Sequence, residues 1–498
     1  MGCKITVLPE NKIIEANQGK FLLDVLAQNG IFLPAACAGK GTCGKCRVRL
    51  LSGGVSGVVP DADGYVLSCH AVLTEDVTVE VDAQSGHGLN AFDASCVRGD
   101  AEGVGVILDI GTTTLAAAAI ELSSGEIIKR VSSLNPQGVC GADVLSRIKA
   151  CGEGKGDLLQ KLILEQTKKL LSMLGATDAS ELTVAANTTM LHLLLGVDPS
   201  TIGVYPFTPV FTEERVVAGA ELGLPVETVR LLPSVSAYIG SDITAGVLSL
   251  GMHRNARTEL FVDVGTNGEI VLSHKGKLYA ASTAAGPALE GACIECGMGG
   301  IAGAIDHVSL KGGKITFSTV DNVPARGICG SGLIDLIALL LHEGLIDETG
   351  AWDEESDSFF VQYLREGRFY LTEEIYLSQA DIRQFQLAKA AIAAGIETLL
   401  SECGVATDAV ETLYLAGGLG YYMDVQKAGD VGLLPRALTD RTHAVGNTAM
   451  AGARLCLLGA AAREEIVVLS RCTEIVELSF SPTFQDAYVE NMMFLQGD

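Results

Sequence analysis

The sequence predicts a multidomain α/β protein, and three observations carry this prediction. The chain has 498 residues, enough for two to four domains with large cores. Its 58 glycines and 48% apolar content suit a loop-rich α/β architecture better than helical bundles. One strand-and-loop pattern occurs twice, ending at Asp109 and again at Asp263, which indicates the duplication of a whole lobe.

Charge and cysteine content restrict the class of function. The chain has 35 basic and 60 acidic residues, a formal net charge of −25, which argues against nucleic acid or an anionic membrane surface as partner. Its 14 cysteines form no dense secreted-type framework and indicate a reducing compartment. The N-terminus lacks signal-peptide features, and no charge-free run of eighteen apolar residues occurs. We therefore expect a cytoplasmic protein that spans no membrane.

The N-terminal segment reads as short strands around one helix. Residues 3–8 and 11–15 alternate like strands, and residues 21–28 carry apolar side chains at helical spacing before Gly30, which is suited to end a helix. Further strands are expected at residues 47–51, 65–69 and 77–81.

A glycine-rich cysteine loop, C-A-G-K-G-T-C-G-K-C, follows that helix. It carries Cys37, Cys43 and Cys46, and Cys69 comes later in S-C-H. Three thiolates on one short loop and a distant fourth are typical of a [2Fe–2S] ligand set, and the glycines let the backbone curl around the sulfurs. A zinc site or a disulfide knot is the alternative, but zinc sites usually show two C-x₂-C pairs and only one lies here. This arrangement resembles a plant-type or adrenodoxin-type ferredoxin, which implies a β-grasp fold over residues 1–85.

Past a stretch of linker composition, the chain repeats one pattern. Residues 104–110 form a buried-type strand ending in D-I-G-T-T-T, followed by extended runs at 115–122 and 126–131. Residues 259–264 form another, ending in D-V-G-T-N-G, followed by a run at 270–273. Helices are expected at residues 142–151, 157–174, 241–252, 330–343, 378–402 and 447–458 and from residue 188, strands at 182–186 and 412–416, and the last forty residues as strands and a tail.

A strand that ends in Asp and continues as Gly-Thr-Thr builds a turn that grips phosphate. Backbone N–H groups and hydroxyls hold phosphate oxygens, and the Asp holds Mg²⁺ or positions water. One such loop alone is also compatible with an ordinary tight turn. Two copies, together with Gly417 and Gly418 after a late strand, are the stronger signal.

This triple pattern resembles the acetate and sugar kinase, heat-shock cognate and actin superfamily, with a duplicated ribonuclease-H-type α/β fold. The resemblance implies that ATP binds between two lobes, with Asp109 and Asp263 as catalytic carboxylates. The nucleotide-binding residues that it implies are Gly111, Thr112 and Thr113 in the first loop, Gly265, Thr266, Asn267 and Gly268 in the second, and Gly417 and Gly418 at the adenosine.

Four local motifs, A-A-G-P-A-L-E-G at 284–291, C-G-M at 296–298, G-A-I-D at 303–306 and G-I-C-G-S-G-L-I-D at 327–335, resemble the reductive activators of corrinoid enzymes. The expected layout is a ferredoxin-like domain at 1–85, a flexible linker at 86–103 and a two-lobed ATPase domain at 104–498. Its first lobe would cover about 104–240 and its second about 241–445, with the C-terminal segment returning to the first. Known members carry a middle domain between the ferredoxin and ATPase parts, and none is expected here.

The resemblance implies an ATP-hydrolysing electron-transfer enzyme. It would pass one electron from the [2Fe–2S] cluster to an inactive Co(II) corrinoid and return it to Co(I) for methyl transfer, with ATP and Mg²⁺. The implied partners are a corrinoid protein or its methyltransferase complex, a low-potential electron donor and a second copy in a homodimer. The alternatives are an ATP-gated electron donor to an enzyme such as a 2-hydroxyacyl-CoA dehydratase, and a redox-sensing nucleotide-binding regulator.

Overall fold

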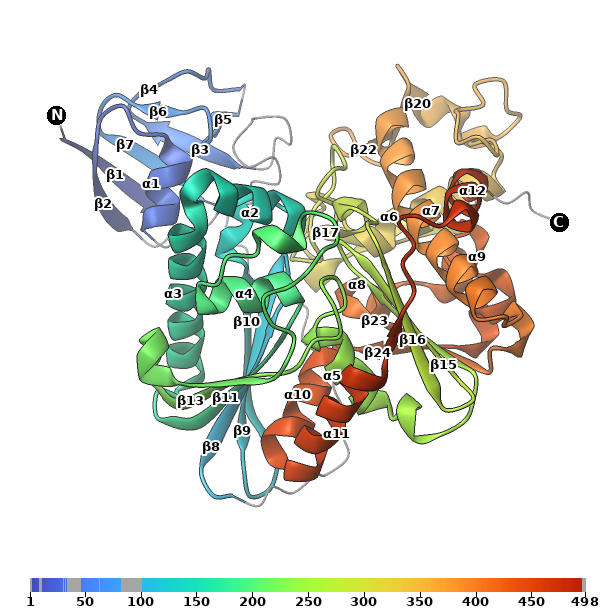
Figure 1. Cartoon of the computed structure of the whole chain (residues 1–498). Coiled ribbons are helices and arrows are strands. Elements are labelled where there is room, and N and C mark those ends of the chain that lie inside the picture. Colours follow the sequence, from blue (N-terminus) through green and yellow to red (C-terminus); the bar gives the residue numbers. More distant parts are fainter. Residues whose placement is uncertain are drawn as a thin grey trace.

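The computed structural model describes residues 2–8, 11–29, 31, 33, 46–61, 63–81 and 101–494. Figure 1 shows a small β-rich body at the N-terminus and two larger α/β lobes side by side. Within the described residues, no helix is long and apolar enough to cross a bilayer. The predicted linker lies largely outside these ranges.

The N-terminal body is a five-stranded mixed sheet in the order β2-β1-β7-β3-β5, with one helix packed on it. β1 and β2 form an antiparallel hairpin, whereas β1 and β7 run parallel. Ile5, Leu22 and Val48 are fully buried between sheet and helix. The elements are β1 (Gly2–Leu8), β2 (Lys12–Asn17), α1 (Leu22–Gln28), β3 (Arg47–Ser52), β4 (Val55–Ser56), β5 (Tyr65–Leu67), β6 (Val72–Leu73) and β7 (Val77–Glu80). This is the β-grasp fold that the sequence predicts.

The first lobe is built on a six-stranded sheet in the order β10-β9-β8-β11-β13-β12. β8, β9 and β10 form an antiparallel meander, and β11 pairs in parallel with β8. The strands are β8 (Val104–Ile110), β9 (Thr114–Glu121), β10 (Ile127–Leu134), β11 (Ala179–Ala186), β12 (Arg215–Ala218) and β13 (Val226–Leu231), and the helices are α2 (Val144–Ala150), α3 (Gly156–Leu174) and α4 (Thr188–Leu195).

The second lobe repeats this pairing scheme. Its sheet has the order β24-β23-β14-β15-β16-β25, with an antiparallel meander β14-β15-β16 and β23 parallel to β14. The strands are β14 (Glu259–Val264), β15 (Gly268–His274), β16 (Lys277–Thr283), β23 (Thr412–Ala416), β24 (Thr442–Gly446) and β25 (Glu474–Ile475). The duplication suggested by the repeated motif is therefore present in the fold.

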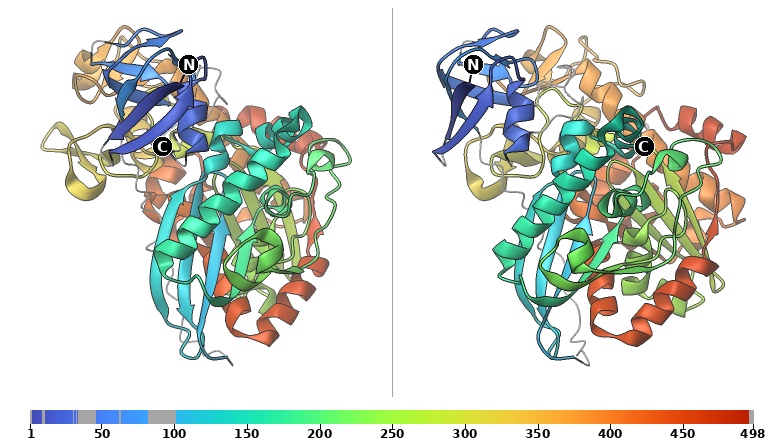
Figure 2. Two further views of the ribbon diagram at one scale, coloured as in Figure 1. Left: turned by 90° about the vertical axis from the view of Figure 1, so that its left-hand side faces the viewer. Right: turned by 60° about the vertical axis from the view of Figure 1, so that its left-hand side comes forward.

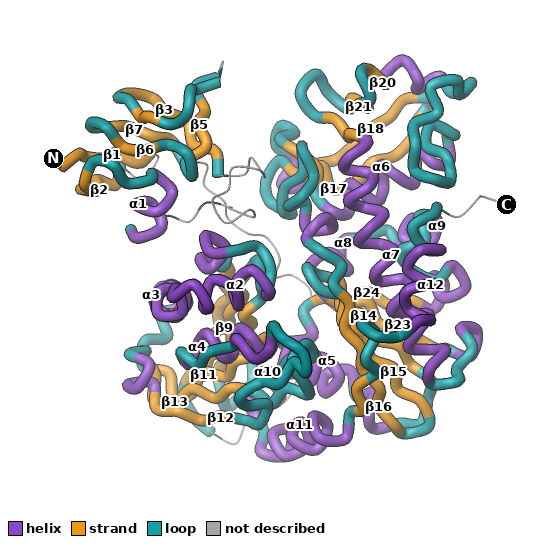
Figure 3. The backbone as a smooth tube through the Cα atoms, turned by 45° about the horizontal axis from the view of Figure 1, so that its top comes forward, coloured by secondary structure: helices purple, strands orange, loops and turns teal. Residues whose placement is uncertain are grey.

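Three helices fill the space between the two sheets, as Figure 3 shows. They are α5 (Ser241–Leu250), α10 (Thr448–Leu458) and α11 (Ala460–Cys472). Their side chains share one core with Ile107 of the first sheet and Phe261 of the second. α5 and α10 cross so closely that a Cβ atom on Gly452 would lie 2.0 Å from the Ala245 carbonyl oxygen. This close crossing fixes the separation of the lobes.

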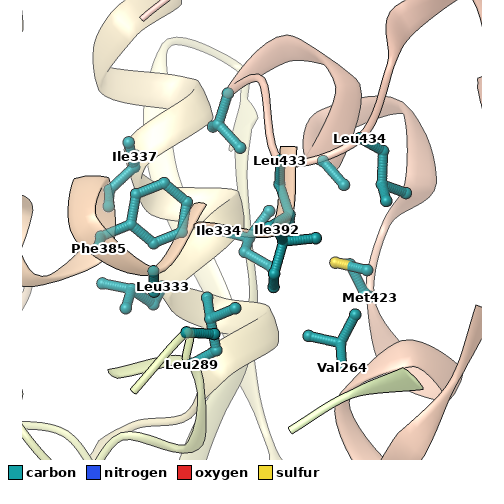
Figure 4. Close-up of a cluster of buried hydrophobic side chains, with 14 of the residues drawn as sticks. Val264, Leu289, Leu333, Ile334, Ile337, Phe385, Ile392, Met423, Leu433 and Leu434 are labelled. Carbon is teal, nitrogen blue, oxygen red and sulfur yellow. The ribbon is translucent and has the colours of Figure 1, made fainter. Parts of the chain in front are cut away.

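A second core supports the inner edge of the second lobe. Figure 4 shows Val264 and Leu289 packed into it with Leu333, Phe385 and Met423. The surrounding elements are β17 (Ala304–Lys311), β18 (Lys314–Thr319), β19 (Gly327–Ile328), α6 (Gly330–His342), β20 (Leu364–Arg365), β21 (Arg368–Tyr370), β22 (Tyr376–Ser378), α7 (Gln379–Glu402), α8 (Gly417–Tyr422), α9 (Val425–Asp430) and α12 (Pro482–Glu490).

Figure 2 places the N-terminal body at one end of the first lobe, where α1 contacts the 3₁₀ helix η1 (Pro136–Cys140). η1 directly follows β10, and its N-cap is Asn135. The small body therefore touches a segment that continues from the first sheet.

The expectation of strands in the last forty residues is wrong. This segment forms α11 and α12, and only the short β25 is a strand. The consecutive β-branched residues Ile466, Val467 and Val468 favour a strand locally. Tertiary packing decides otherwise, because Ile466 and Leu469 share one helical face and are buried between the lobes.

The α5–α10 crossing gives a stability prediction. Gly452→Ala should lower the free energy of unfolding by about 1–3 kcal/mol, because the added methyl overlaps the α5 backbone. Gly156→Ala is the matched control, since that glycine is helical (φ −56°) with no atom within 4 Å of an added Cβ. Urea unfolding of the two variants makes the comparison, and equal midpoints would contradict the packing described.

Candidate active site

The first predicted phosphate loop is a tight turn between β8 and β9. Asp109 lies next to the end of β8, and the Gly111 N–H donates to the Thr114 carbonyl over 3.0 Å. A Cβ on Gly111 would lie 2.6 Å from that oxygen, so the turn requires glycine. Asn135 Nδ2 donates to the Gly111 carbonyl (2.8 Å), and the Asn135 N–H donates to the Thr113 carbonyl (2.7 Å). The residue that follows β10 thus holds the loop.

The second predicted loop has the same position on the second sheet. Asp263 lies next to the end of β14, and the Gly265 N–H donates to the Asn267 carbonyl over 3.0 Å. Gly268 begins β15 and pairs with the last residue of β14. Both loops therefore connect the first two strands of a meander.

One carboxylate joins the two loops. Glu290 ends the 3₁₀ helix η6 (Pro287–Glu290), and its Oε2 accepts hydrogen bonds from Thr113 Oγ1 (2.7 Å) and Thr266 Oγ1 (2.8 Å). Two hydroxyls from different lobes thus converge on one anionic oxygen, an arrangement that a phosphate oxygen would also satisfy. This places the loops opposite each other.

The third predicted motif lies beside the second loop. β23 pairs with β14, and α8 begins at Gly417, whose φ of 87° favours glycine. A Cβ on Gly417 would lie 2.7 Å from Asp263 Oδ1. Among the described residues, no atom lies within 4 Å of an added Cβ on Gly418, so this position is open there. The three sequence motifs therefore meet in one region.

Thr112 of the first loop is held by two residues that sequence reasoning missed. The buried Arg147 of α2 donates through Nη2 to the Thr112 carbonyl. Asn187, the N-cap of α4, donates through Nδ2 to Thr112 Oγ1 over 3.3 Å. Burial lowers the pKa of Arg147 to about 10, and the guanidinium still carries positive charge near neutral pH. Asn187 directly follows a buried strand, as the residues after Asp109 and Asp263 do. This position in the sequence could have marked it as a candidate site residue.

Asp109 and Asp263 have strongly perturbed acidities. Both are half-buried, with protein on most sides. Desolvation raises the pKa of Asp109 to about 6, although a hydrogen bond from Asn447 Nδ2 (2.7 Å) opposes the shift. Desolvation, followed by repulsion from Asp109 and Glu290, raises the pKa of Asp263 to about 7. The two carboxylates thus share one negatively charged region between the lobes.

Two further carboxylates join this region. Asp242 lies in the first turn of α5, two residues after Gly240. A Cβ on Gly240 would lie 2.4 Å from Asn187 Cα, so the start of α5 packs closely against the start of α4. Desolvation and then the charges of Asp263 and Asp109 raise the pKa of Asp242 to about 8. The pKa of Glu269 is raised well above its usual range, first by burial and then by Asp242 and Asp263. Sequence reasoning recognised Asp242 only as part of a helix start.

Two of the four predicted cluster ligands lie in the described residues. Cys46 and Cys69 are both buried, with 1% and 5% of their surface exposed. Ser68 joins them, because its N–H and Oγ donate to the Cys46 carbonyl over 2.9 and 2.8 Å. Two buried thiols on adjoining segments are compatible with a shared cluster. Cys37 and Cys43 lie outside the described residues.

The basic residues beside the cysteine loop are paired. Arg47 forms an ion pair with Asp61, and its guanidinium carbon lies 4.6 Å from the centroid of the Tyr65 ring. Arg49 Nη1 lies 3.7 Å from Glu80 Oε2. Their charge is therefore partly compensated within the domain.

A second cysteine pair, Cys293 and Cys296, lies in the second lobe with C-x-x-C spacing. Cys293 is exposed, and the Cys296 thiol donates to the Glu374 carbonyl over 3.7 Å.

A ferredoxin-type body joined to a duplicated two-lobed nucleotide fold defines an iron–sulfur ATPase. Three family models match the chain. A "2Fe-2S iron-sulfur cluster binding domain" matches residues 5–74, a "RACo middle region" 104–255, and the "C-terminal domain of RACo the ASKHA domain" 257–498.

Three of the similar proteins are named for the activation or reduction of corrinoid proteins. "Corrinoid activation enzyme RamQ" of Eubacterium limosum is 34% identical over 78% of this chain and 70% of its own length. A "[Co(II) methylated amine-specific corrinoid protein] reductase" of Methanosarcina barkeri is 23% identical over 77% of this chain and 76% of its own. A solved "Reductive activator for corrinoid, iron-sulfur protein" is 29% identical, with a TM-score of 0.74 over 100% of this chain and 99% of that one. The chain belongs to the family of reductive activators of corrinoid proteins.

One expectation about this family is wrong. The chain does have the middle region that was taken to be missing, because the model of that region matches residues 104–255. These residues contain the first six-stranded sheet and the first phosphate loop. Because this segment carries the repeated loop, the sequence assigns it to the ATPase domain. The family models instead treat it as a separate middle region.

The raised pKa values of these carboxyl groups predict a pH-dependent stability. Between the unfolded pKa of about 4 and the folded value of about 8, the folded protein holds an extra proton on Asp242. The contribution of this group is therefore most favourable at low pH and is lost as pH rises through 8. Asp242→Asn should raise the melting temperature of the magnesium-free, nucleotide-free protein, by about 1 °C per kcal/mol gained for a chain of this size, and more at pH 8 than at pH 6.

The exposed Asp486 of α12 provides the control for this experiment. Asp486→Asn should show no such pH-dependent gain in differential scanning fluorimetry. An equal gain at both pH values for Asp242→Asn would show that this carboxylate is not desolvated as described.

Proposed function

We propose that this protein uses ATP to drive the transfer of one electron from its [2Fe–2S] domain to a Co(II) corrinoid protein, returning the cobalt to Co(I). The observation that carries this proposal is the convergence of Thr113 and Thr266, from two duplicated lobes, on the single acceptor Glu290. The same chain carries a ferredoxin-type domain. The names of the similar proteins supply the substrate class.

The energetics explain why ATP is needed. Each ~59 mV of unfavourable one-electron potential costs about 1.4 kcal/mol. Plant-type clusters lie at roughly −400 mV, and Co(I) corrinoids are stronger reductants according to the family resemblance. A ligand shifts such an equilibrium only by its differential affinity for two states. ATP must therefore favour a complex in which Co(II) is easier to reduce, or from which the product does not return.

We assign the cluster to Cys37, Cys43, Cys46 and Cys69. Cys46 and Cys69 support the assignment because both thiols are buried and their segments are hydrogen-bonded to each other. When bound, such a cluster supplies one-electron transfer without proton chemistry. The chain's own part is to bury the thiols, hold the backbone that carries them and exclude water.

We assign the triphosphate of ATP to the space between the two loops, and the adenosine to the side of Gly417 and Gly418. The backbone N–H groups of the two loops would bind phosphate oxygens. The positive charge of Arg147, behind Thr112, would favour the phosphates over longer range. The open position beside Gly418 leaves room for a ligand.

The buried carboxylates support Mg²⁺ as the companion ion. Asp109, Asp242 and Asp263 repel one another, and a divalent cation would relieve this repulsion. Among the described residues, no three acidic, His or Cys side chains are arranged to hold a metal by themselves. This fits Mg²⁺, which usually takes one or two carboxylates and completes its shell with phosphate and water.

The further partners follow from charge and resemblance. A low-potential electron donor must reduce the cluster, since the ATPase lobes supply no electrons. The net charge of −25 disfavours nucleic acid and anionic membranes as partners, and the cysteine usage favours the cytoplasm. Assembly as a homodimer rests on the family resemblance alone.

ATP hydrolysis in the presence of a Co(II) corrinoid protein tests the function. The reduced holoprotein should hydrolyse ATP faster with the Co(II) partner than without it. Absence of stimulation, together with absence of corrinoid reduction, would contradict the proposal.

A cysteine variant tests the cluster assignment. Cys69→Ser should abolish the visible absorbance of the [2Fe–2S] cluster and leave ATP binding unchanged. Cys3→Ser is the matched control, because Cys3 is also buried in this domain and its thiol donates to the Ala16 carbonyl. Retention of the absorbance in Cys69→Ser would remove this residue from the ligand set.

A carboxylate variant tests the second loop. Asp263→Ala should reduce ATP turnover at least about 100-fold and leave the cluster spectrum intact, because Asp263 lies between the phosphate loop and Gly417. Steady-state phosphate release measures the effect. Turnover within threefold of the wild-type rate would show that the loop does not contact the reacting phosphate.

A further inference from the structure

The side chain of Glu290 contacts the phosphate loops of both lobes. Its Oε2 accepts from Thr113 Oγ1 of the first loop and Thr266 Oγ1 of the second, at 2.7 and 2.8 Å. Its Oε1 would be 3.8 Å from a Cβ on Gly265, so the carboxylate also faces the second-loop backbone. Any phosphate bound by both loops must come to within a few ångströms of this group.

The backbone that carries Glu290 is held firmly. At its start, the Gly286 N–H donates to the Thr266 carbonyl over 2.8 Å. At its end, Gly291 has a φ of 75°, and a Cβ there would lie 2.4 Å from the Met298 carbonyl oxygen. Leu289, which directly precedes Glu290, is buried in the core shown in Figure 4. A carboxylate on such a rigid support is suited to positioning a small reactant.

The other acidic groups of the site have different partners. Asp109 accepts from the Asn447 amide, and Asp263 packs against the Gly417 backbone. Asp242 lies behind both, at the start of α5. Glu290, in contrast, accepts hydrogen bonds from a hydroxyl of each phosphate loop.

We propose that Glu290 is the general base of ATP hydrolysis, which orients the attacking water and accepts its proton. This inference rests on the ATPase activity proposed above. The water oxygen forms a bond to the terminal phosphorus, and the bond from that phosphorus to the bridging oxygen breaks. The electron pair of the broken bond stays on the terminal oxygen of ADP, and one water proton moves to the Glu290 carboxylate. That proton then passes to solvent or to the released phosphate.

Phosphoryl transfer demands little covalent chemistry, so the orientation of the nucleophile contributes much of what the protein supplies. General-base catalysis typically contributes about 10²–10⁴-fold in rate. Thr113 and Thr266 fit this role as positioning residues, because they hold the base while both lobes are correctly placed. Hydrolysis would thereby depend on the relative position of the lobes.

The experiment compares Glu290→Gln with Glu295→Gln in the full-length holoprotein. Glu295 lies on the same segment, but its carboxylate accepts from Tyr376 OH (2.8 Å) and faces Arg368. In Glu290→Gln, single-turnover hydrolysis should fall at least about 100-fold while the Kd for ATP stays within threefold. Glu295→Gln should retain the wild-type rate.

Chemical rescue separates catalysis from support of the fold. In Glu290→Ala, added formate should restore part of the lost rate, because the small carboxylate fits the space left by the side chain. Hydrolysis by Glu290→Gln within threefold of the wild-type rate would overturn the inference, as would a failure of formate to raise the rate of Glu290→Ala. A wild-type protein that hydrolyses no ATP would instead overturn the proposed function.

Discussion

The structure depends on the confinement of negative charge between its two lobes. Asp109, Asp242 and Asp263 come from two strand ends and one helix start. Desolvation, joined at Asp242 and Asp263 by repulsion from neighbouring carboxylates, raises their pKa values to about 6, 8 and 7. Holding several carboxylates close together in a desolvated region is unfavourable, and such groups with perturbed pKa values cluster at functional sites. The close crossing of α5 and α10 keeps the lobes at the separation that brings these groups together. The confined charge supports the proposal that this site binds a cation together with phosphates.

The ferredoxin-type domain contacts a segment that supports the first phosphate loop. α1 of the ferredoxin-type body contacts η1, and the N-cap of η1 is Asn135, which holds both Gly111 and Thr113. Buried Gln137 of η1 lies within hydrogen-bond reach of Arg147, which donates to Thr112. A physical link therefore runs from the ferredoxin-type body to the first phosphate loop. This link is a route by which nucleotide binding could favour one placement of the electron donor.

Local chemistry made much of the fold predictable. The cysteine loop and the two Asp-x-Gly-Thr turns each lie within a few residues, so the cysteine spacing and the repetition of the turn can be recognised in the sequence. Glu290, Asp242 and Asn447 were missed because they reach the site only through tertiary structure; Asn447 and Asp109, for example, are 338 residues apart. The C-terminal helices were misread because Ile466, Val467 and Val468 favour a strand locally, whereas burial against the lobes selects a helix.

The central claim is that nucleotide binding between the lobes controls an uphill electron transfer. The most direct measurement mixes the cluster-reduced protein anaerobically with a Co(II) corrinoid protein and follows the Co(II) and Co(I) absorbance bands. With ATP and Mg²⁺, Co(I) should appear in proportion to the electrons supplied, and without ATP it should remain near the baseline. Equal formation of Co(I) with and without ATP would contradict the account.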